Sequence, residues 1–208
     1  MCIIERNPTT LAETVAAARR FSQVRDFQID LAAEDGLQPL LRHLEDVGKL
    51  DILIHCAGVI HQDFMEHAHI EDLDLQYAIN VRAPYFLTQR SLPWLTAARG
   101  QIVFINSSVG LSAKRPEVGQ YAATKHALRA IADSLREELN GKGIRVLSVY
   151  LGRTATPMQE SLCREEGKLY RPEILLQAED VASAVVRILM LPATAEVTDI
   201  SIRPTIKG

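Results

Sequence analysis

Short apolar runs alternate with longer amphipathic stretches along the whole of this chain, and no other feature limits its possible folds as strongly. The runs Ile52–Ile54 and Ile102–Ile105 are continuously apolar, which is typical of strands that are buried on both faces. Leu37–Leu44 and Gly119–Leu139 instead carry apolar residues at helical spacing. Strands that alternate with helices predict an α/β fold, in which a doubly wound, mostly parallel sheet lies between two layers of helices.

Length, charge and cysteine content narrow the class of protein. The chain has 208 residues and a net charge of −3, so we expect one domain over residues 1–208 and no nucleic-acid partner. No apolar run is long enough to span a membrane and no signal-peptide pattern is seen, which favours a cytoplasmic protein without a membrane partner. Cys2, Cys56 and Cys163 are widely spaced and match neither a disulfide framework nor a metal site, so we expect no bound metal.

The expected strand ends are the places to look for a site, because ligands of open α/β sheets bind beyond the carboxyl ends of the strands. The residues at these ends are Glu5 and Arg6, Asp30, Ala57 and Gly58, Ser107 and Ser108, and Leu151 and Gly152. A charged, irregular stretch over residues 152–177 follows the last of them and is a candidate flap over a site.

Tyr121 and Lys125 are the first candidates for chemistry. They lie four residues apart near the start of an expected helix, so their side chains leave the same face. A nearby ammonium group stabilises a phenolate and lowers the pKa of the phenol, which makes the pair a workable acid and base for an alcohol oxygen. A packed ring beside a solvated surface charge is the alternative explanation of the same spacing.

Ser107 and Ser108 favour the catalytic interpretation, because they follow the strand expected at Gln101–Asn106. A hydroxyl at that position can donate to a substrate oxygen while the phenol protonates it. Both serines are also suited to capping the turn after the strand. We expect Ser107 to cap the turn and Ser108, thirteen residues before Tyr121, to act in catalysis.

The segment from Gln101 to Lys125, QIVFINSSVGLSAKRPEVGQYAATK, resembles the catalytic core of the short-chain dehydrogenase/reductase family, in which a serine precedes a Tyr-x-x-x-Lys motif. Further segments resemble family motifs in the same order along the chain: Asp30–Leu31, Leu50–Gly58 (LDILIHCAG), Ile79–Val81 (INV) and Leu151–Met158 (LGRTATPM). The resemblance covers essentially the whole chain and implies a Rossmann-like domain.

The resemblance implies a role for each matching residue. Tyr121 would be the general acid and base, Lys125 would lower its pKa and hold the nicotinamide ribose, and Ser108 would orient the substrate carbonyl. Asn80 would anchor a water that links Lys125 to solvent, with packing at a helix kink as the alternative. The residues implied in cofactor binding are Arg6, Asp30, Leu31, Ala57, Gly58, Tyr121, Lys125, Gly152 and Thr156.

The choice between nicotinamide cofactors depends on two adjacent residues. Glu5 stands about where an acid would bind the ribose hydroxyls of NAD, and Arg6 stands where a base would bind the 2′-phosphate of NADP. Because Arg6 is followed by Asn7 and Pro8, the sequence favours NADP, with NAD as the alternative.

One family feature is missing from the sequence. The first glycine is Gly36, so no glycine-rich turn precedes the strand at Cys2–Ile4, and the chain opens at what resembles the family's second strand. We therefore expect a sheet that lacks the first strand and the first helix, with unpaired edges where Cys2–Ile4 faces the strand at Asp51–Ala57. Three explanations are open: a start at an internal methionine of a longer product, which we favour because the downstream catalytic positions are intact; a natural fragment or degenerate paralogue; or a fold that closes the gap in another way.

These observations predict an NAD(P)-dependent oxidoreductase that interconverts a small ketone and a secondary alcohol. The alternative is a catalytically inactive, truncated paralogue that acts as a binding or assembly partner. A sugar-nucleotide epimerase is disfavoured, because the chain ends soon after its last strand. Val109, Leu151 and Met158 suggest a largely apolar substrate pocket. The resemblance also implies a homodimer or homotetramer, built by the helices around Leu73–Ala97 and Gly119–Leu139.

Overall fold

The structure, a computed structural model, describes residues 1–206, apart from the side chains of residues 34 and 35. Its strands are β1 (Cys2–Glu5), β2 (Arg25–Gln28), β3 (Ile52–His55), β4 (Gln101–Ser107), β5 (Arg145–Leu151) and β6 (Asp199–Ile202). Its α-helices are α1 (Pro8–Ala18), α2 (Gln38–Val47), α3 (Ile70–Tyr77), α4 (Ala83–Ala98), α5 (Gly119–Asn140), α6 (Pro157–Glu165) and α7 (Ala178–Leu189).

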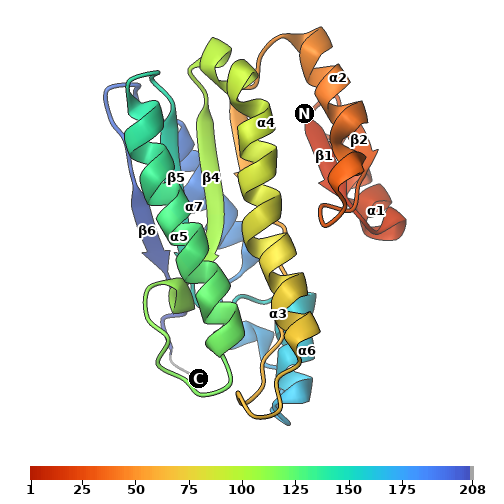
Figure 1. The fold of residues 1–208 in the computed structure, drawn as a ribbon, viewed down its shortest axis with the longest axis vertical. Coiled ribbons are helices and arrows are strands. Elements are labelled where there is room, and N and C mark those ends of the chain that lie inside the picture. The colour runs from red at the N-terminus through yellow and green to blue at the C-terminus, as the bar shows by residue number, and fades with distance from the viewer. Residues whose placement is uncertain (207–208) are drawn as a thin grey trace.

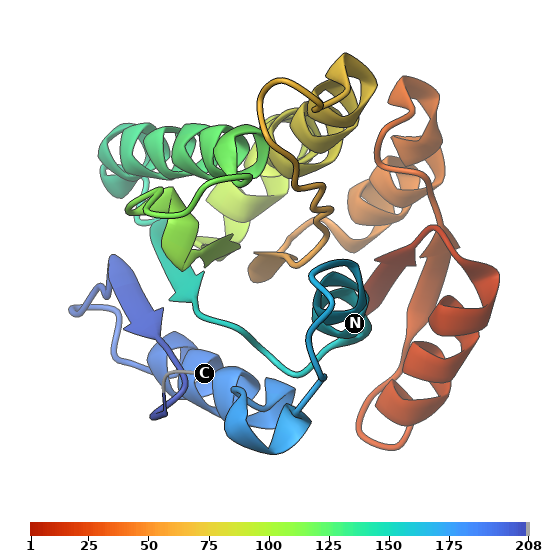
Figure 2. The same cartoon turned by 90° about the horizontal axis from the view of Figure 1, so that it is seen from below.

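The strands form two parallel sheets. In one sheet β1 pairs with β2, and in the other β3, β4, β5 and β6 follow one another in this order. Helices α2, α4 and α5 cover one side of the strands, and α1, α6 and α7 lie on the other side (Figures 1 and 2). The predicted α/β class, with strands between two layers of helices, is confirmed.

A slot separates the two sheets. Within residues 1–206, no strand pairs with the edges of β1 and β3 that border this slot, so the unpaired edges expected at this place are present. The slot is a cavity of about 600 Å³, and Ile4, Leu40 and Leu87 are among its lining residues. Ile52 and Ile54 on β3 are 41% and 43% exposed, although apolar strands of parallel sheets are usually buried on both faces.

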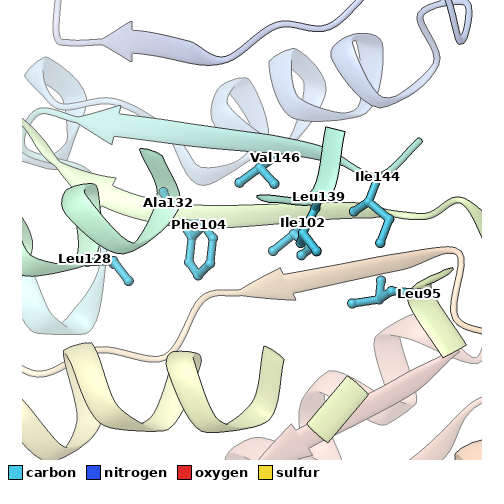
Figure 3. Packing of buried hydrophobic residues seen from close by; sticks show 8 residues of the cluster. All are labelled: Leu95, Ile102, Phe104, Leu128, Ala132, Leu139, Ile144 and Val146. Atoms are coloured by element: carbon cyan, nitrogen blue, oxygen red, sulfur yellow. The ribbon is translucent and has the colours of Figure 1, made fainter. Parts of the chain in front are cut away.

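Apolar side chains cover both faces of β4 at the centre of the larger sheet. On one face, Ile102 and Phe104 pack with Leu128 and Ala132 of α5 in a cluster of buried residues (Figure 3). On the other face, Val103 packs with residues of β5 and α7. Because successive side chains of a strand point to opposite faces, β4 contacts both helical layers, and α5 is fixed relative to the carboxyl end of β4.

The long helix expected between about residues 72 and 97 is divided into α3, a π-helical turn at Ala78–Arg82, called η2, and α4. Pro84 has no N–H group, so it cannot donate to the carbonyl of Asn80, which would be its partner in an α-helix. The helix widens there, and the Ala83 amide donates to the Ala78 carbonyl instead. The interruption places Asn80 at the distorted point of the helix.

His55 at the end of β3 leads to a prediction of acid sensitivity. Its ring stacks on Phe104 with 4.9 Å between ring centres, its Nε2 lies 2.8 Å from the Thr88 hydroxyl, and burial lowers its pKa to about 3. An unfolded histidine has a pKa of about 6.5, so the unfolded chain binds more protons than the folded chain between these two values. The free energy of unfolding is therefore expected to fall as the pH drops below about 6.5, by about 1.4 kcal/mol for each unit over which only the unfolded state is protonated.

Urea unfolding of the wild-type protein and of His55→Asn across this pH range measures the effect. We expect a smaller acid-dependent loss of stability in His55→Asn and an unchanged loss in the control His67→Asn, whose ring is exposed. Equal pH slopes for His55→Asn and the wild-type protein would show that His55 is not the source.

Candidate active site

The carboxyl end of β4 and the first turns of α5 meet at a cavity of about 430 Å³, called the active-site cavity below. Tyr121 and Lys125 lie one turn apart on α5, and Ser107 is the last residue of β4. All three line the cavity. The structure therefore brings together a strand-end serine, the tyrosine and the lysine that the sequence indicated.

Ser107 is the serine that contacts Tyr121. Burial raises the pKa of Tyr121 above its ordinary value, and a hydrogen bond with the Ser107 side chain opposes this rise. Ser107 also caps the turn as expected, because its Oγ accepts a hydrogen bond from the Val109 amide at 3.4 Å. Ser108 lines the same cavity, but it begins the 3₁₀ turn Ser108–Gly110 and is exposed.

The geometry thus favours Ser107 as the serine beside the Tyr121 phenol. The residue spacing alone had assigned this place to Ser108. Ser107 still belongs to the β4 ladder, where it pairs with Leu151, so its direction is fixed by the strand. Ser108 lies beyond the last pair of this ladder. Counting thirteen residues back from Tyr121 could not reveal where the strand ends, and the catalytic role of either serine stays a prediction.

Lys125 is a buried cation. It is 4% exposed, its Nζ donates to the Ile105 carbonyl at 3.3 Å, and burial lowers its pKa to about 8. Its Nζ lies 5.7 Å from the centre of the Tyr121 ring. We expected Lys125 to lower the pKa of Tyr121, but burial has the larger effect in this structure and the pKa is raised. At neutral pH Tyr121 is therefore a protonated phenol beside a charged Lys125, which suits it to donate a proton.

Asn80 connects three elements behind the cavity. Its Oδ1 accepts a hydrogen bond from the Val59 amide at 2.9 Å, and its Nδ2 donates to the Val59 carbonyl at 2.9 Å and to the Thr124 hydroxyl at 3.1 Å. The residue is 1% exposed. From the turn η2, it therefore ties the loop after β3 to α5. Both amide hydrogens are used in these contacts, so the side chain is a structural tie, and its part in a proton relay stays a prediction.

Besides Tyr121 and Lys125, three of the expected cofactor residues, Gly58, Gly152 and Thr156, line the active-site cavity. A Cβ atom at Gly58 would lie 3.3 Å from Asn80 Oδ1 and 3.7 Å from Lys125 Nζ, so a side chain there would crowd the catalytic candidates. The hydroxyl of Thr156 caps the N-terminus of α6. These positions border Tyr121 and Lys125, as the nicotinamide end of a dinucleotide would require.

Three other expected cofactor residues, Asp30, Leu31 and Ala57, lie by the slot rather than in the active-site cavity. Leu31 and Ala57 line the slot, and Asp30 beside them accepts a hydrogen bond from the Ala32 amide at 2.9 Å. Cys56 lines both the slot and the active-site cavity, so the two cavities adjoin. The two groups of residues therefore lie at adjoining cavities.

Glu5 and Arg6 differ in how they are engaged. The Glu5 carboxylate accepts hydrogen bonds from the Arg6 amide at 2.7 Å and the Asn7 amide at 2.9 Å. Arg6 is exposed at the end of β1. The acid is held by local backbone, while the guanidinium group faces solvent at the place expected for a 2′-phosphate.

The residues present fit the two ends of a nicotinamide dinucleotide. Tyr121, Lys125 and Gly58 suit the nicotinamide end, and Arg6 and Asp30 suit the adenine end. A pyrophosphate is usually held by backbone amides of a glycine-rich turn at a helix N-terminus. Among the described residues, the chain contains no glycine before residue 36, so such a turn is not among them.

A cluster of ion pairs borders the active-site cavity, and no sequence pattern indicated this cluster. Glu166, just after α6, accepts hydrogen bonds from Arg153 with both oxygens at 2.8 Å, from Arg115 at 3.0 Å and from Lys168 at 2.8 Å. Burial raises the pKa of Glu166, but these cations outweigh it and lower the pKa to about 2. The sequence showed only a charged flap, because ion pairs between distant loops leave no periodic signal.

Two further findings concern other classes of site. In the part of the chain that the structure describes, no group of three or more His, Cys, Asp and Glu side chains is placed to hold a metal ion. A search of the same residues finds no helix with the length and apolar character needed to cross a membrane.

The chain matches the family model described as short chain dehydrogenase over residues 1–167. It is 28% identical over 205 residues to an uncharacterized oxidoreductase of Staphylococcus epidermidis, and the match covers 97% of this chain and 85% of that protein. It is 31% identical over 190 residues to an uncharacterized short-chain type dehydrogenase/reductase of Sinorhizobium fredii, covering 85% of this chain and 76% of the relative. The chain therefore belongs to the short-chain dehydrogenase family of oxidoreductases.

A shorter match and the solved structures add named activities of other proteins. Over 118 residues the chain is 39% identical to an NADPH-dependent 3-dehydrocapnine reductase of Ornithobacterium rhinotracheale, covering 53% of this chain and 41% of that enzyme. An alcohol dehydrogenase from the archaeon Thermococcus sibiricus, complexed with 5-hydroxy-NADP, has a TM-score of 0.87 at 20% identity and covers 100% of this chain and 86% of that chain. At this identity the structural likeness shows the fold alone.

The contacts of Asn80 lead to a prediction about stability. Asn80→Ala removes the partner of the Val59 amide and of the Val59 carbonyl. A buried group left without a partner costs about 1–3 kcal/mol, and Val59 is half-buried, so we expect Asn80→Ala to lower the free energy of unfolding by about that amount. Thr124→Val is the matched control with a smaller expected loss, because it leaves Val59 satisfied and removes the acceptor of only one Asn80 amide hydrogen. Urea unfolding that gave equal losses for the two variants would contradict the structural role of Asn80.

Proposed function

We propose that this protein interconverts a small ketone and a secondary alcohol with NADP as the cofactor, and that reduction is the direction its resting site is prepared for. The observation that carries the proposal is the grouping of Ser107, Tyr121 and Lys125 in one cavity at the end of β4. A hydroxyl, a phenol and an ammonium group are the groups needed to bind and protonate a carbonyl oxygen.

In this proposal each side chain acts at a stated atom. Tyr121 donates its proton to the carbonyl oxygen, and Ser107 donates a hydrogen bond to the same oxygen. Lys125 keeps a positive charge near the phenol and stabilises the phenolate that is left after the transfer. Asn80 acts as a positioning residue, because its bonds to Val59 and Thr124 hold the loop after β3 against α5. When bound, the cofactor supplies or accepts the hydride at the carbonyl carbon.

The proposed cofactor residues fall into two groups. The nicotinamide part would contact Ala57, Gly58, Gly152 and Thr156 in addition to Tyr121 and Lys125, and the adenine part would contact Arg6, Asp30 and Leu31. The exposed Arg6 and the locally engaged carboxylate of Glu5 support NADP over NAD. The named NADPH dependence of the Ornithobacterium rhinotracheale relative points in the same direction.

The proposal also covers the kind of substrate, the oligomeric state and the location in the cell. An apolar wall that includes Val109, Leu151 and Met158 supports a small carbonyl compound with an apolar part as substrate. We also propose a homodimer or homotetramer that is built through the helices after β3 and β4. We propose a cytoplasmic location, since the family match gives no reason for another one.

A catalytically inactive assembly partner is the second candidate function, and one observation favours it. The slot interrupts the sheet between β1 and β3, which lies on the path that joins the two proposed cofactor ends. If a cofactor cannot span this slot, the chain would keep its fold and its surface helices but would not catalyse a reaction.

Ser107→Ala, Ser108→Ala and Tyr121→Phe test the proposed chemistry. Loss of an acid–base group costs about 10²–10⁴ in rate, so we expect Tyr121→Phe and Ser107→Ala each to lower kcat/KM by about 10² or more. Ser108→Ala, the matched control, is expected to stay within about tenfold because its side chain is exposed and the bond to Tyr121 comes from Ser107. Ketone-dependent oxidation of NADPH followed by absorbance is the measurement. The reverse order of the two serine variants would restore the catalytic role to Ser108.

Cofactor binding by the 208-residue chain distinguishes the two candidate functions. Fluorescence titration with NADPH and with NADH is expected to give saturable binding that is tighter for NADPH, because the guanidinium group of Arg6 pairs with the 2′-phosphate. In Arg6→Gln the preference for NADPH is expected to fall by about tenfold with little change for NADH. A folded chain that binds neither dinucleotide would favour the inactive assembly partner.

A further inference from the structure

The ion-pair cluster around Glu166 has more positive than negative charge. Glu166 is contacted by Arg115, Arg153 and Lys168, and its carboxylate is ionised over the whole neutral range because its pKa is lowered to about 2. One carboxylate therefore faces three cations. In a chain whose net charge is −3, this is a local excess of the opposite sign.

The excess reaches the active-site cavity. Arg115, Lys125 and Arg153 line it, and Glu166 is the acid among its lining residues in the described chain. Lys168 does not line the cavity, although it contacts the same carboxylate. The remaining wall is largely apolar, so a charge inside the cavity is screened less than it would be in bulk water.

Both arginines retain donors after binding Glu166. A guanidinium group has five N–H donors. Arg115 directs Nη2 to Glu166 at 3.0 Å and to Gln62 at 3.4 Å, and Arg153 directs Nη2 to both Glu166 oxygens. Their side chains are 42% and 34% exposed, so they are held in place and still accessible. Fixed guanidinium groups with free donors are suited to bind a carboxylate in two-point geometry.

We propose that the substrate is an oxo acid or hydroxy acid, and that Arg115 and Arg153 bind its carboxylate while Tyr121 and Ser107 act on its carbonyl or hydroxyl oxygen. This inference rests on the proposed oxidoreductase function and narrows its substrate class. Glu166 is a positioning residue, because its carboxylate holds both guanidinium groups at the cavity wall. The cluster also ties the loop that carries Arg115, the segment after β5 and the end of α6 to one another across the cavity.

A purely structural role of the cluster predicts different behaviour. If the ion pairs only hold α6 against the loops, removal of Arg115 and of Lys168 would have similar effects, since each loses one contact to Glu166. Removal of either residue would also change the turnover of charged and neutral substrates alike. The two variants Arg115→Gln and Lys168→Gln therefore separate recognition from support.

The test uses matched pairs of probes with NADPH: acetoacetate against methyl acetoacetate, and levulinate against methyl levulinate. In the wild-type protein we expect a lower KM for each acid than for its ester. Arg115→Gln is expected to raise the KM for the acids by about tenfold, with kcat and the KM for the esters within about twofold, since one charge-assisted hydrogen-bonded contact is lost. Lys168→Gln is expected to leave all four values nearly unchanged.

Glu166→Gln gives a change of opposite sign. It removes the competing negative charge, while the amide oxygen can still accept a hydrogen bond from a guanidinium group and keep it at the cavity wall. We therefore expect the KM for the acids to fall while the KM for the esters does not fall. A rise in KM for acids and esters together in Arg115→Gln or Glu166→Gln would overturn the proposal in favour of a structural cluster. Reduction of the esters with no preference for the acids in the wild-type protein would also overturn it and leave the proposed function standing.

A binding measurement covers the case in which none of the probes is reduced. Butyrate has the carboxylate but no carbonyl to reduce, and thermal unfolding in the presence of butyrate reports its binding without turnover. We expect butyrate to raise the Tm of the wild-type protein and of Lys168→Gln, and to raise that of Arg115→Gln much less. Equal shifts in the three proteins, or no shift in any of them, would overturn carboxylate recognition by Arg115 independently of the fate of the proposed function.

Discussion

The packing of α5 against β4 and β5 is the interaction on which the site depends. The strand supplies Ser107 at its end, and the helix supplies Tyr121 and Lys125 in its first turns. Neither element could hold these groups together alone, because a strand end and a helix face are positioned only by what they pack against. The buried cluster around Phe104 and Leu128 provides that contact from Leu128 to Leu139 of the helix (Figure 3). The apolar core therefore sets the geometry of a polar site that lies at its edge.

The same packing explains the electrostatics. Burial lowers the pKa of Lys125 to about 8 and raises that of Tyr121, so both groups are moved towards their uncharged forms. A buried ammonium group is costly unless its hydrogen bonds are satisfied, and the Ile105 carbonyl contributes one such bond. Glu166 shows the opposite balance, because three cations outweigh the cost of its burial. Desolvation thus dominates at the catalytic end of the cavity, and ion pairing dominates at the other.

Much of the fold could be predicted from the sequence, because continuous apolar runs and helical spacing are set by burial along each element. The gap beside β3 also followed from the sequence, since the position of a family strand can be counted even where it is absent. The choice between two adjacent residues for the same role could not be made from the sequence in this way. Whether Ser107 or Ser108 meets the phenol depends on where the β4 ladder ends, which is decided by pairing with β5. The division of the long helix at Asn80 could have been found from Pro84, because a residue without an N–H group removes one helical bond. The Glu166 cluster had no such signal, because its members come from separate loops.

The slot has a consequence for the behaviour of the protein in solution. The two sheets are joined through a layer of leucines on α2 and α4, and the backbone edges of β1 and β3 beside the slot have no strand partner in the described chain. Unpaired strand edges with apolar side chains such as Ile52 and Ile54 are templates for pairing between molecules. Association between molecules at these edges is therefore expected to increase with protein concentration. Such a molecule can give the spectroscopic signals of a folded protein and still aggregate through its unpaired strand edges.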